Sequence, residues 1–393
     1  MQYNFDQVWD RRGTNCSKWD FADKRFGGTG LLPLSIADMD FPISSAIIRR
    51  MQERLEFPIF GYERLSDKYY EALAGWMERR HNYKIQNDWI VFTSGVCTAL
   101  SYAVDALTPE NSEVLVPTPV YHHFFSAIEN VNRTVKSVPV KQAESGRYTY
   151  DFEALEQAVT EKTSAIMLCS PHNPVGRVWD KEELEEMAKF CLKHDLLVID
   201  DEIHHDLTFD KKHTVFCSIS PEIEARCVLC TAPSKTFNVA GMKVSNTIIP
   251  NPELREKFKK YMKKNNAAEP HAMAEAVVVG AYAESEQWVD EMLLYVKANI
   301  DYFCDEIEKR MPQLKPIRPE GTYMLCVDFS SLGLIPEEIS SFLVHDCKLA
   351  VNQGAIFGKG GEQMARFNLA CPRAIVDEAL NRLESGLSAF NNK

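Results

Sequence analysis

The sequence predicts a doubly wound α/β fold, with a large domain around a mostly parallel seven-stranded sheet and a smaller α+β domain after it. Two observations support this prediction. From about Ser45 onward, apolar runs of strand length alternate with helical patterns, and several runs are apolar throughout, as expected when helices cover both faces of a parallel sheet. After about Tyr282 the pattern changes to one long helix followed by mixed strands and helices.

The large domain contains seven predicted strands with helices between them. The strands are expected at residues 89–93, 113–117, 134–140, 165–170, 196–201, 226–232 and 244–250. Among the helices, Asp180–His194 is the clearest, because acidic side chains lie in its first turn, basic ones near its end and apolar ones along one side. A second helix is expected over Ser66–His81.

The second domain is expected to begin after residue 282. Its predicted elements are a helix at 288–311, a strand at 323–328, a helix at 336–346, a glycine-rich loop, a strand at 365–370 and a final helix from Ala374. No linker rich in Pro, Gly and Ser divides the chain, so the boundaries depend on element order alone. We expect an N-terminal segment (1–44) packed with the small domain, a large domain (45–282) and a small domain (283–393).

The composition argues against two classes of partner. The 393 residues carry 44 Lys and Arg against 56 Asp and Glu, and this net charge of −12 disfavours nucleic acids and anionic membranes, which are held by concentrated positive charge. The basic run Arg255–Lys264 is expected to be the solvated face of a helix. No segment approaches the roughly 20 apolar residues that cross a bilayer, and the opening residues lack the apolar core of a secretion signal.

The cysteines indicate a reducing compartment. There are eleven of them, an odd number scattered along the whole chain, which fits free thiols better than a disulfide framework and predicts a cytoplasmic protein. Cys227 and Cys230 have the spacing of metal ligands, but they lie in an apolar run and no second such pair exists. We therefore interpret them as part of a buried strand and expect no metal there.

The residues most informative about function follow the carboxyl ends of predicted strands, where open α/β sheets bind ligands. Lys235 comes just after the run 226–232, and Asp201 ends the run 196–201. A carboxylate buried at such a position is costly unless it meets a positive partner. Two alternatives stay open for this region, a helix cap at Asp201 and a metal site. The metal site would be built from Asp200, Asp201, Glu202, His204 and His205.

Two further strand ends add polar groups. Asn173 lies in the turn Ser170–Gly176, which two prolines and a glycine make rigid, and Ser94 and Gly95 open a helix whose N–H groups suit a phosphate. Each signal alone is equally typical of an ordinary strand-to-helix turn. Together, the anion cradle, amide, buried carboxylate and lysine match what pyridoxal 5'-phosphate (PLP) requires. The lysine forms a Schiff base with the aldehyde, the carboxylate keeps the pyridine nitrogen protonated, and the amide binds the phenolic oxygen.

These motifs, in their order along the chain, resemble the landmarks of fold-type I PLP-dependent enzymes, the aspartate aminotransferase superfamily. The landmarks are SGV, PVY, SPHNPVG, DDEIHHD, SKTFNVAGMK and RFNLACPR, and the resemblance runs from about Ala37 to Arg373. Within the superfamily the chain is most similar to the MalY/PatB-type carbon–sulfur lyases, also called cystathionine or cysteine-S-conjugate beta-lyases. The finer likeness lies in ADMDF (37–41), FGYERL (60–65), DEIH (201–204), SKTFN (234–238), VNQGAIFG (351–358) and RFNLACPR (366–373). His204 stands where many related aminotransferases carry a tyrosine.

The resemblance implies a role for each candidate residue. Lys235 is implied to be the Schiff-base lysine and catalytic base, and Asp201 the partner of the pyridinium. Around the ring, Tyr121 is expected to stack, with Asn173 and His204 near the phenolic oxygen. The phosphate is expected to contact the backbone of Val96 and Cys97, the Ser234 hydroxyl and Tyr62 of a neighbouring subunit. The substrate is expected to contact Arg366, Ala37 and Asn173.

Some of these roles have alternatives. Lys243 occupies a position where aminotransferases often carry a phosphate-binding arginine, and a lysine supplies the charge without the two-pronged geometry. Arg366 is also suited to an ion pair that locks two domains, and Tyr62 to ordinary packing or a surface hydroxyl. The family is homodimeric, with its active site at the subunit interface, so the resemblance implies a homodimer.

The resemblance implies α,β-elimination from L-cystathionine or a related cysteine S-conjugate, which yields a thiol, pyruvate and ammonia. Amino transfer on the same fold begins with the same removal of the Cα proton, and therefore stays an alternative. A third possibility is a regulatory binding protein in which PLP is only a structural ligand. The sequence does not choose among cystathionine, cysteine and other S-conjugates.

Overall fold

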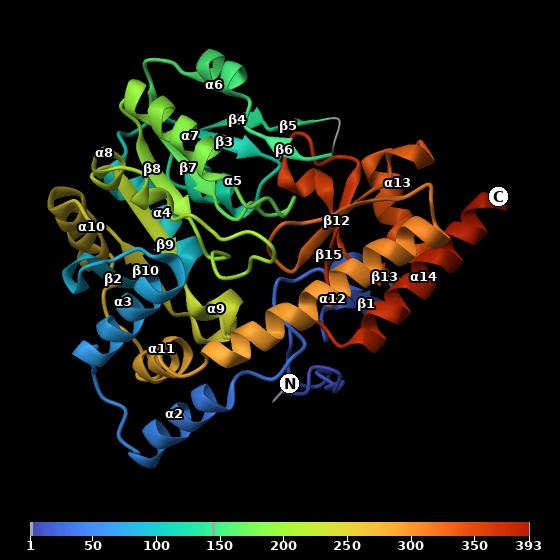
Figure 1. The fold of residues 1–393 in the computed structure, drawn as a ribbon, viewed down its shortest axis with the longest axis horizontal. Helices are drawn as coiled ribbons and strands as arrows, with labels where there is room; N and C mark the ends of the chain where they lie inside the picture. Colours follow the sequence, from blue (N-terminus) through green and yellow to red (C-terminus); the bar gives the residue numbers. More distant parts are fainter. Residues whose placement is uncertain (1–2, 144–145, 393) are drawn as a thin grey trace.

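The computed structural model describes residues 3–143 and 146–392 and contains two separate main sheets. A seven-stranded sheet lies among helices in the part coloured cyan to yellow in Figure 1, and a four-stranded sheet lies beside the long helices of the orange and red part. The predicted α/β fold with a second, smaller sheet is confirmed. The exact domain boundaries 1–44, 45–282 and 283–393 remain our proposal.

All seven predicted strands of the large sheet are present. The sheet order is β2 (Ile90–Thr93), β10 (Ser245–Ile248), β9 (Cys227–Thr231), β8 (Leu197–Asp201), β7 (Thr163–Cys169), β3 (Glu113–Thr118) and β4 (Thr134–Pro139). Only β10 runs against its neighbours, so the sheet is mostly parallel as expected. All five residues of β9 are buried, which confirms the strand interpretation of Cys227 and Cys230.

Helices pack around this sheet (Figure 1). They are α2 (Ser45–Glu56), α3 (Asp67–His81), α4 (Val96–Leu107), α5 (His123–Glu129), α6 (Phe152–Ala158), α7 (Lys181–Lys193), α8 (Pro221–Glu224), α9 (Pro233–Thr236), α10 (Pro252–Lys264) and α11 (Ala274–Tyr282). The expected helix at 180–194 is α7. It begins after Asp180, whose backbone N–H donates to the Glu183 carboxylate at 2.8 Å, because this capping box supplies partners for the first turn.

The smaller sheet has the order β11 (Lys315–Ile317), β12 (Met324–Asp328), β15 (Met364–Asn368), β14 (Asn352–Gln353) and is antiparallel. Its helices are α12 (Glu286–Arg310), α13 (Pro336–Ser341) and α14 (Arg373–Asn391). The N-terminal part contains α1 (Ala22–Phe26) and β1 (Leu32–Pro33), and β1 pairs in parallel with β13 (Leu349–Ala350). The short hairpin β5 (Lys141–Gln142) and β6 (Tyr148–Thr149) completes the strands and was not predicted.

The basic run 255–264 needs one correction. It forms most of α10, but Arg255 is buried rather than solvated. Its guanidinium donates to the Asp88 carboxylate and to the carbonyl of Ile249, each at 2.7 Å. The sequence alone predicts a surface position for Arg255, because its partner Asp88 is 167 residues away along the chain. In the described residues no helix is both long and apolar enough to span a membrane.

Gly280 provides a test of helix packing in this fold. A Cβ at this position on α11 would lie 2.8 Å from the Cα of Ile47 on α2, so the two helix backbones require glycine there. We expect Gly280→Ala to lower the free energy of unfolding by about 1–2 kcal/mol, because overpacking outweighs the gain in helix propensity. Gly75→Ala on α3 is the matched control, since its Cβ meets only the tip of Arg79. Urea unfolding of both variants measures the difference, and equal stability would contradict this explanation.

Candidate active site

A pocket of about 200 Å³ lies where the carboxyl ends of β7, β8 and β9 and the start of α4 meet. Every residue expected to contact PLP or the substrate, except Arg366 and Tyr62, lines it. The lining residues are Ala37, Ser94, Gly95, Val96, Cys97, Thr98, Tyr121, Cys169, Asn173, Asp201, Ile203, His204, Ser234, Lys235, Ala240, Lys243 and Val244. The structure therefore brings together residues that are up to 207 positions apart, here Ala37 and Val244.

Lys235 lies on the short helix α9, directly after β9. Its Nζ donates to the backbone carbonyl oxygen of Ala37 at 2.7 Å. Burial lowers the pKa of the Lys235 amine, and the nearby Arg366 guanidinium adds to this effect. Since a neutral amine is the nucleophilic and basic form, both effects favour chemistry at this nitrogen.

Asp201 ends β8 and is fully enclosed. One carboxylate oxygen, Oδ1, accepts from the backbone N–H of Ile203 at 3.1 Å. Burial raises the pKa of Asp201 to about 7, although the Ile203 N–H and the Lys235 charge partly offset the increase. A buried carboxyl with a raised pKa is stabilised as an anion by any cationic group that enters the pocket.

His204 lies in the same pocket, one turn after Asp201. Its Nδ1 is buried and has no hydrogen-bond partner within the described residues. Burial, with smaller effects from Lys235 and Arg366, holds the pKa of His204 well below its usual value, so the ring is neutral. The pocket lining therefore includes a buried neutral imidazole.

The start of α4 forms the anion cradle. Gly95 precedes the helix with a φ of 108°, a conformation that favours glycine, and its N–H donates to the Ser245 hydroxyl at 3.0 Å. The N–H groups of Val96 and Cys97 belong to the first turn, which has no intrahelical acceptors. Because Ser234 and Lys243 line the same pocket, the N–H groups, a hydroxyl and an ammonium group are all available to one phosphate.

Arg366 lies on β15 of the small sheet and is 2% exposed. Its Nη1 donates to Oδ1 of Asn173 at 2.8 Å, and its Nη2 donates to the Ser35 carbonyl at 3.0 Å. This contact orients the Asn173 amide, so that Nδ2 is the end left for an acceptor in the pocket. The guanidinium also lies 4.8 Å from the centre of the Phe357 ring. Arg366 thus joins the small sheet to the pocket. Within residues 3–143 and 146–392 it has no carboxylate partner, which argues against the ion-pair alternative.

Sequence reasoning missed the residues that fix the segment Ser35–Phe41, which crosses the pocket. The Nδ2 of Asn368 donates to the carbonyls of Ile36 and Asp38, both at 2.6 Å. On the other side, Asn238 binds both backbone groups of Met39 and the carbonyl of Phe41. The two asparagines lie in the motifs SKTFN and RFNLACPR, but a motif does not indicate that its side chain binds a distant backbone.

The residues of the alternative metal site lie on two sides of the turn that follows β8. Asp201 and His204 face the pocket, whereas His205 lies behind it with Asp206 and His81. Among the described residues, His81, His205 and Asp206 form the only group of three or more potential ligands whose ligand atoms all lie within 4.8 Å of one another. The five residues proposed as metal ligands therefore do not converge on one point.

The Asp206 carboxylate is instead a buried hydrogen-bond centre. It accepts from Trp76 Nε1 at 2.9 Å, from His81 Nε2 at 2.7 Å and from the Thr236 hydroxyl at 2.7 Å, and His205 Nε2 lies 3.2 Å away. Burial opposes ionisation, but the two histidines outweigh it and hold the pKa of Asp206 well below its usual value. Because Thr236 adjoins Lys235, this centre also anchors α9, the short helix that carries Lys235.

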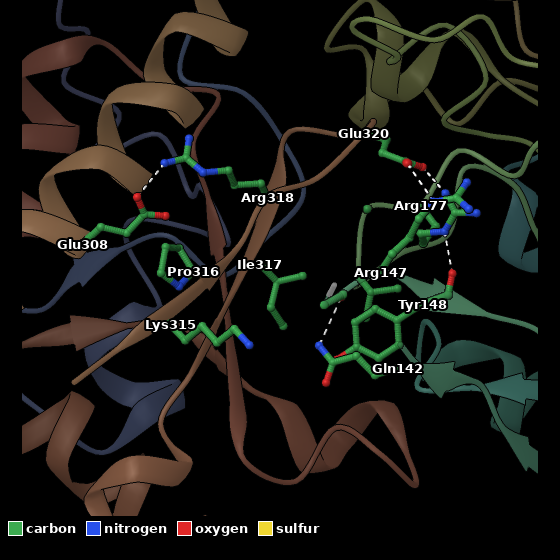
Figure 2. A pocket seen from close by; sticks show the side chains of 13 residues that line it. Gln142, Arg147, Tyr148, Arg177, Glu308, Lys315, Pro316, Ile317, Arg318 and Glu320 are labelled. Carbon is green, nitrogen blue, oxygen red and sulfur yellow. Dashed lines mark hydrogen bonds and ion pairs between the residues drawn. The ribbon is translucent and has the colours of Figure 1, made fainter. Parts of the chain in front are cut away.

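A second cavity, of about 390 Å³, lies between the two sheets (Figure 2). Arg147 and Arg177 point at Glu320 from one side, and Arg318 binds Glu308 at 3.0 Å on the other (Figure 2). This cavity contains none of the candidate residues. The ion pairs of Arg147 and Arg177 with Glu320 connect the large-sheet part to the small-sheet part, whereas the Arg318–Glu308 pair lies within the small-sheet part.

Tyr62 lies outside the pocket and is 98% exposed. It follows a segment whose apolar side chains are also exposed, namely Leu55, Phe57, Ile59 and Phe60. Within one chain Tyr62 makes no contribution to the site, so its expected role depends on a second subunit and stays a prediction.

Comparison with known proteins agrees with this arrangement. The family Aminotransferase class I and II matches residues 29–383, and the chain belongs to that family. More specifically, the chain is similar to Cystathionine beta-lyase PatB of Bacillus subtilis, with 37% identity over 98% of this chain and 100% of PatB. It is also similar to Protein MalY of Escherichia coli, with 31% identity over 98% and 99% of the two chains.

Solved structures show the same fold. Cystalysin from Treponema denticola, whose crystal structure contains a pyridoxal 5'-phosphate cofactor, has a TM-score of 0.95 and 36% identity, covering 99% of this chain and 100% of cystalysin. A PLP-bound putative aminotransferase from Clostridium difficile has a TM-score of 0.96 and 40% identity, with coverage of 98% and 100%. The fold-type I architecture expected from the motifs is confirmed.

Asp206→Ala tests the buried centre behind the pocket. It leaves the donors of Trp76, His81 and Thr236 without an acceptor, so we expect the free energy of unfolding to fall by about 3 kcal/mol or more. Asp301→Ala on α12, which removes only a partly exposed pair with Lys297, is the control and should stay within about 0.5 kcal/mol of the parent. Denaturant unfolding measures both, and a small loss for Asp206→Ala would contradict the assignment.

Proposed function

We propose that the chain binds PLP in this pocket and cleaves the carbon–sulfur bond of L-cystathionine or a related cysteine S-conjugate by α,β-elimination. The observation that carries the proposal is the convergence of Lys235, Asp201 and Asn173 in one pocket beside an anion cradle. The similarity to PatB and MalY supports the lyase reaction over amino transfer.

The pocket fits PLP in its polar groups. Asp201, buried and without a strong cationic partner, suits a protonated pyridine nitrogen. The Nδ2 of Asn173 and the unpartnered Nδ1 of His204 suit the ring substituents, and Tyr121 supplies an aromatic face. The start of α4, Ser234 and Lys243 suit the phosphate. When bound, PLP supplies an aldehyde for an amine and a ring that accepts the electron pair left at Cα.

The side chains of the pocket bind the substrate and move its Cα proton. Arg366 offers a planar, two-pronged donor set for the substrate carboxylate, since it is buried and has no carboxylate partner in the part of the chain that the structure describes. The Ala37 backbone borders the same space. The Lys235 amine, whose pKa burial lowers, removes the Cα proton and holds it at Nζ. Loss of the sulfur substituent from Cβ then yields the thiol, and hydrolysis of the remaining product gives pyruvate and ammonia.

An assay without any keto acid tests this proposal. We expect the holoenzyme to release pyruvate and a thiol from L-cystathionine in equal amounts over many turnovers. Lys235→Ala should lower the rate by about 10²–10⁴-fold or more, because the general base is removed. Lys189→Ala, on the outside of α7, is the control and should keep the parent rate. Turnover that depends on an added keto acid would identify an aminotransferase instead.

We also propose that the active form is a homodimer in which Tyr62 of one subunit reaches the phosphate of the other. The exposed apolar segment around Tyr62 supports this proposal, because monomeric proteins rarely leave such contiguous side chains in water. Leu55, Phe57, Ile59 and Phe60 are between 53% and 64% exposed in the single chain. A cytoplasmic location is a further proposal, supported by eleven cysteines that are all unpaired.

Charge placed in this segment tests the dimer. Ile59→Glu should shift the protein from dimer to monomer in sedimentation and reduce activity together with it, because a buried unpaired charge is costly at an interface. Ile335→Glu is the control, since Ile335 is similarly exposed, at 56%, but lies far along the chain on the small-sheet side. A fully active monomer would rule out a role for Tyr62 in the neighbouring site.

A further inference from the structure

We propose that Tyr323 is a positioning residue that keeps the Lys235 amine unprotonated, by sharing the backbone carbonyl of Ala37 with it. This inference rests on the proposed function of the pocket and extends it to a residue outside the pocket lining. Tyr323 immediately precedes β12, in the small-sheet part of the chain. Its hydroxyl donates to the Ala37 carbonyl oxygen at 2.9 Å, the same oxygen that accepts from Lys235 Nζ at 2.7 Å.

The shared oxygen is held in place from both sides. Asn368 donates to the carbonyls that precede and follow Ala37, those of Ile36 and Asp38, at 2.6 Å each. Asn238 holds Met39, two residues further along. The Ala37 carbonyl therefore cannot turn away to favour one donor, and Tyr323 and Lys235 must share it.

Tyr323 is itself fixed and remains a donor. The residue is 1% exposed, and its ring meets the His204 ring edge-on with centroids 6.0 Å apart. Burial raises the pKa of the Tyr323 hydroxyl above its usual value, and the Asp38 charge adds to the increase. The phenol thus keeps its proton over the whole pH range in which an amine of lowered pKa titrates.

Two donors on one carbonyl oxygen compete for its electron density. An ammonium group gains more than a neutral amine from a strong acceptor, because the hydrogen bond is charge-assisted. The Tyr323 hydroxyl therefore weakens the stabilisation of the protonated form of Lys235 and lowers the pKa of the amine. Without that hydroxyl, Lys235 has the oxygen to itself and its pKa rises.

Other charged and titratable groups act on the same amine and are unaffected by Tyr323. They lie on several elements: Cys97 on α4, His123 on α5, Asp201 at the end of β8, His204 after β8, Arg366 on β15 and Asp38 in the crossing segment. Arg366 lowers the pKa of Lys235, whereas Cys97, Asp38 and Asp201 raise it. A variant that removes only the Tyr323 hydroxyl leaves all of these groups in place.

The test measures protonation of Lys235 directly. In the full chain freed of cofactor, Lys235 is labelled with trace acetic anhydride at a series of pH values, and mass spectrometry gives the midpoint of its reactivity. We expect Tyr323→Phe to raise this midpoint by about half a pH unit to one unit, because one hydrogen bond to a shared acceptor is lost. Below the midpoint this corresponds to roughly three- to tenfold less unprotonated amine.

Two further variants make the result specific. Tyr148→Phe removes another buried hydroxyl, one that faces the sulfur of Met364 at 3.7 Å, and should leave the midpoint unchanged. Site-specific 3-fluorotyrosine at position 323 keeps the shape and makes the hydroxyl a stronger donor, so it should lower the midpoint. This second variant decides the question even where Tyr323→Phe folds poorly.

The holoenzyme gives an independent reading. The acidic limb of the pH profile of kcat with L-cystathionine should move upward in Tyr323→Phe, because kcat reports the enzyme–substrate complex, in which the substrate has displaced the Lys235 amine from the cofactor. An unchanged midpoint in both Tyr323 variants overturns the inference and leaves Tyr323 with a packing role. If the holoenzyme releases no pyruvate, the proposed lyase function fails, while the labelling midpoint still decides the role of Tyr323.

Discussion

The site depends on one constraint, the burial of an amine and a carboxyl at the ends of neighbouring strands β9 and β8. Lys235 and Asp201 are both enclosed, and burial shifts their pKa values in opposite directions, toward the neutral form of each. Neither group is neutralised by a close ion pair with the other, because the Lys235 amine binds the Ala37 carbonyl instead. The buried amine and the buried carboxyl therefore match the two reactive groups of PLP, its aldehyde and its basic ring nitrogen.

The turn after β8 shows how a short sequence serves two sides of this site. In DDEIHHD, Asp201 and His204 face the pocket, while Glu202, His205 and Asp206 lie behind it. Behind the pocket, His213 Nε2 lies 2.7 Å from the Glu202 carboxylate. The Asp206 carboxylate accepts hydrogen bonds from residues of α3 and α9. A buried polar cluster is stable only when its groups are paired. The hydrogen bonds of Glu202 and Asp206 behind the pocket therefore fix the turn that carries Asp201 and His204.

Much of this arrangement could be predicted from the sequence, because strands that are buried on both faces are apolar runs and their ends carry polar residues. All seven strands of the large sheet were predicted, and ten of the residues that line the pocket were expected at the site by resemblance. Contacts between side chains and distant backbone groups could not be predicted. Asn238, Asn368 and Tyr323 act on the segment 35–41, and their partners depend on how two sheets pack rather than on any local pattern.

The same segment explains why the N-terminal residues matter to chemistry that occurs at strand ends. Asp40 accepts from Lys18 at 2.6 Å, from Trp19 at 2.9 Å and from Arg11 at 2.7 Å, and these donors outweigh burial and lower its pKa. Lys18 is 1% exposed, and a buried ion pair of this kind contributes little net stability but penalises any arrangement that separates the charges. The ion pair therefore specifies the path of the chain between Ser35 and Phe41. Because that path presents the Ala37 carbonyl to Lys235, a charge cluster outside the pocket fixes the acceptor of the Lys235 amine.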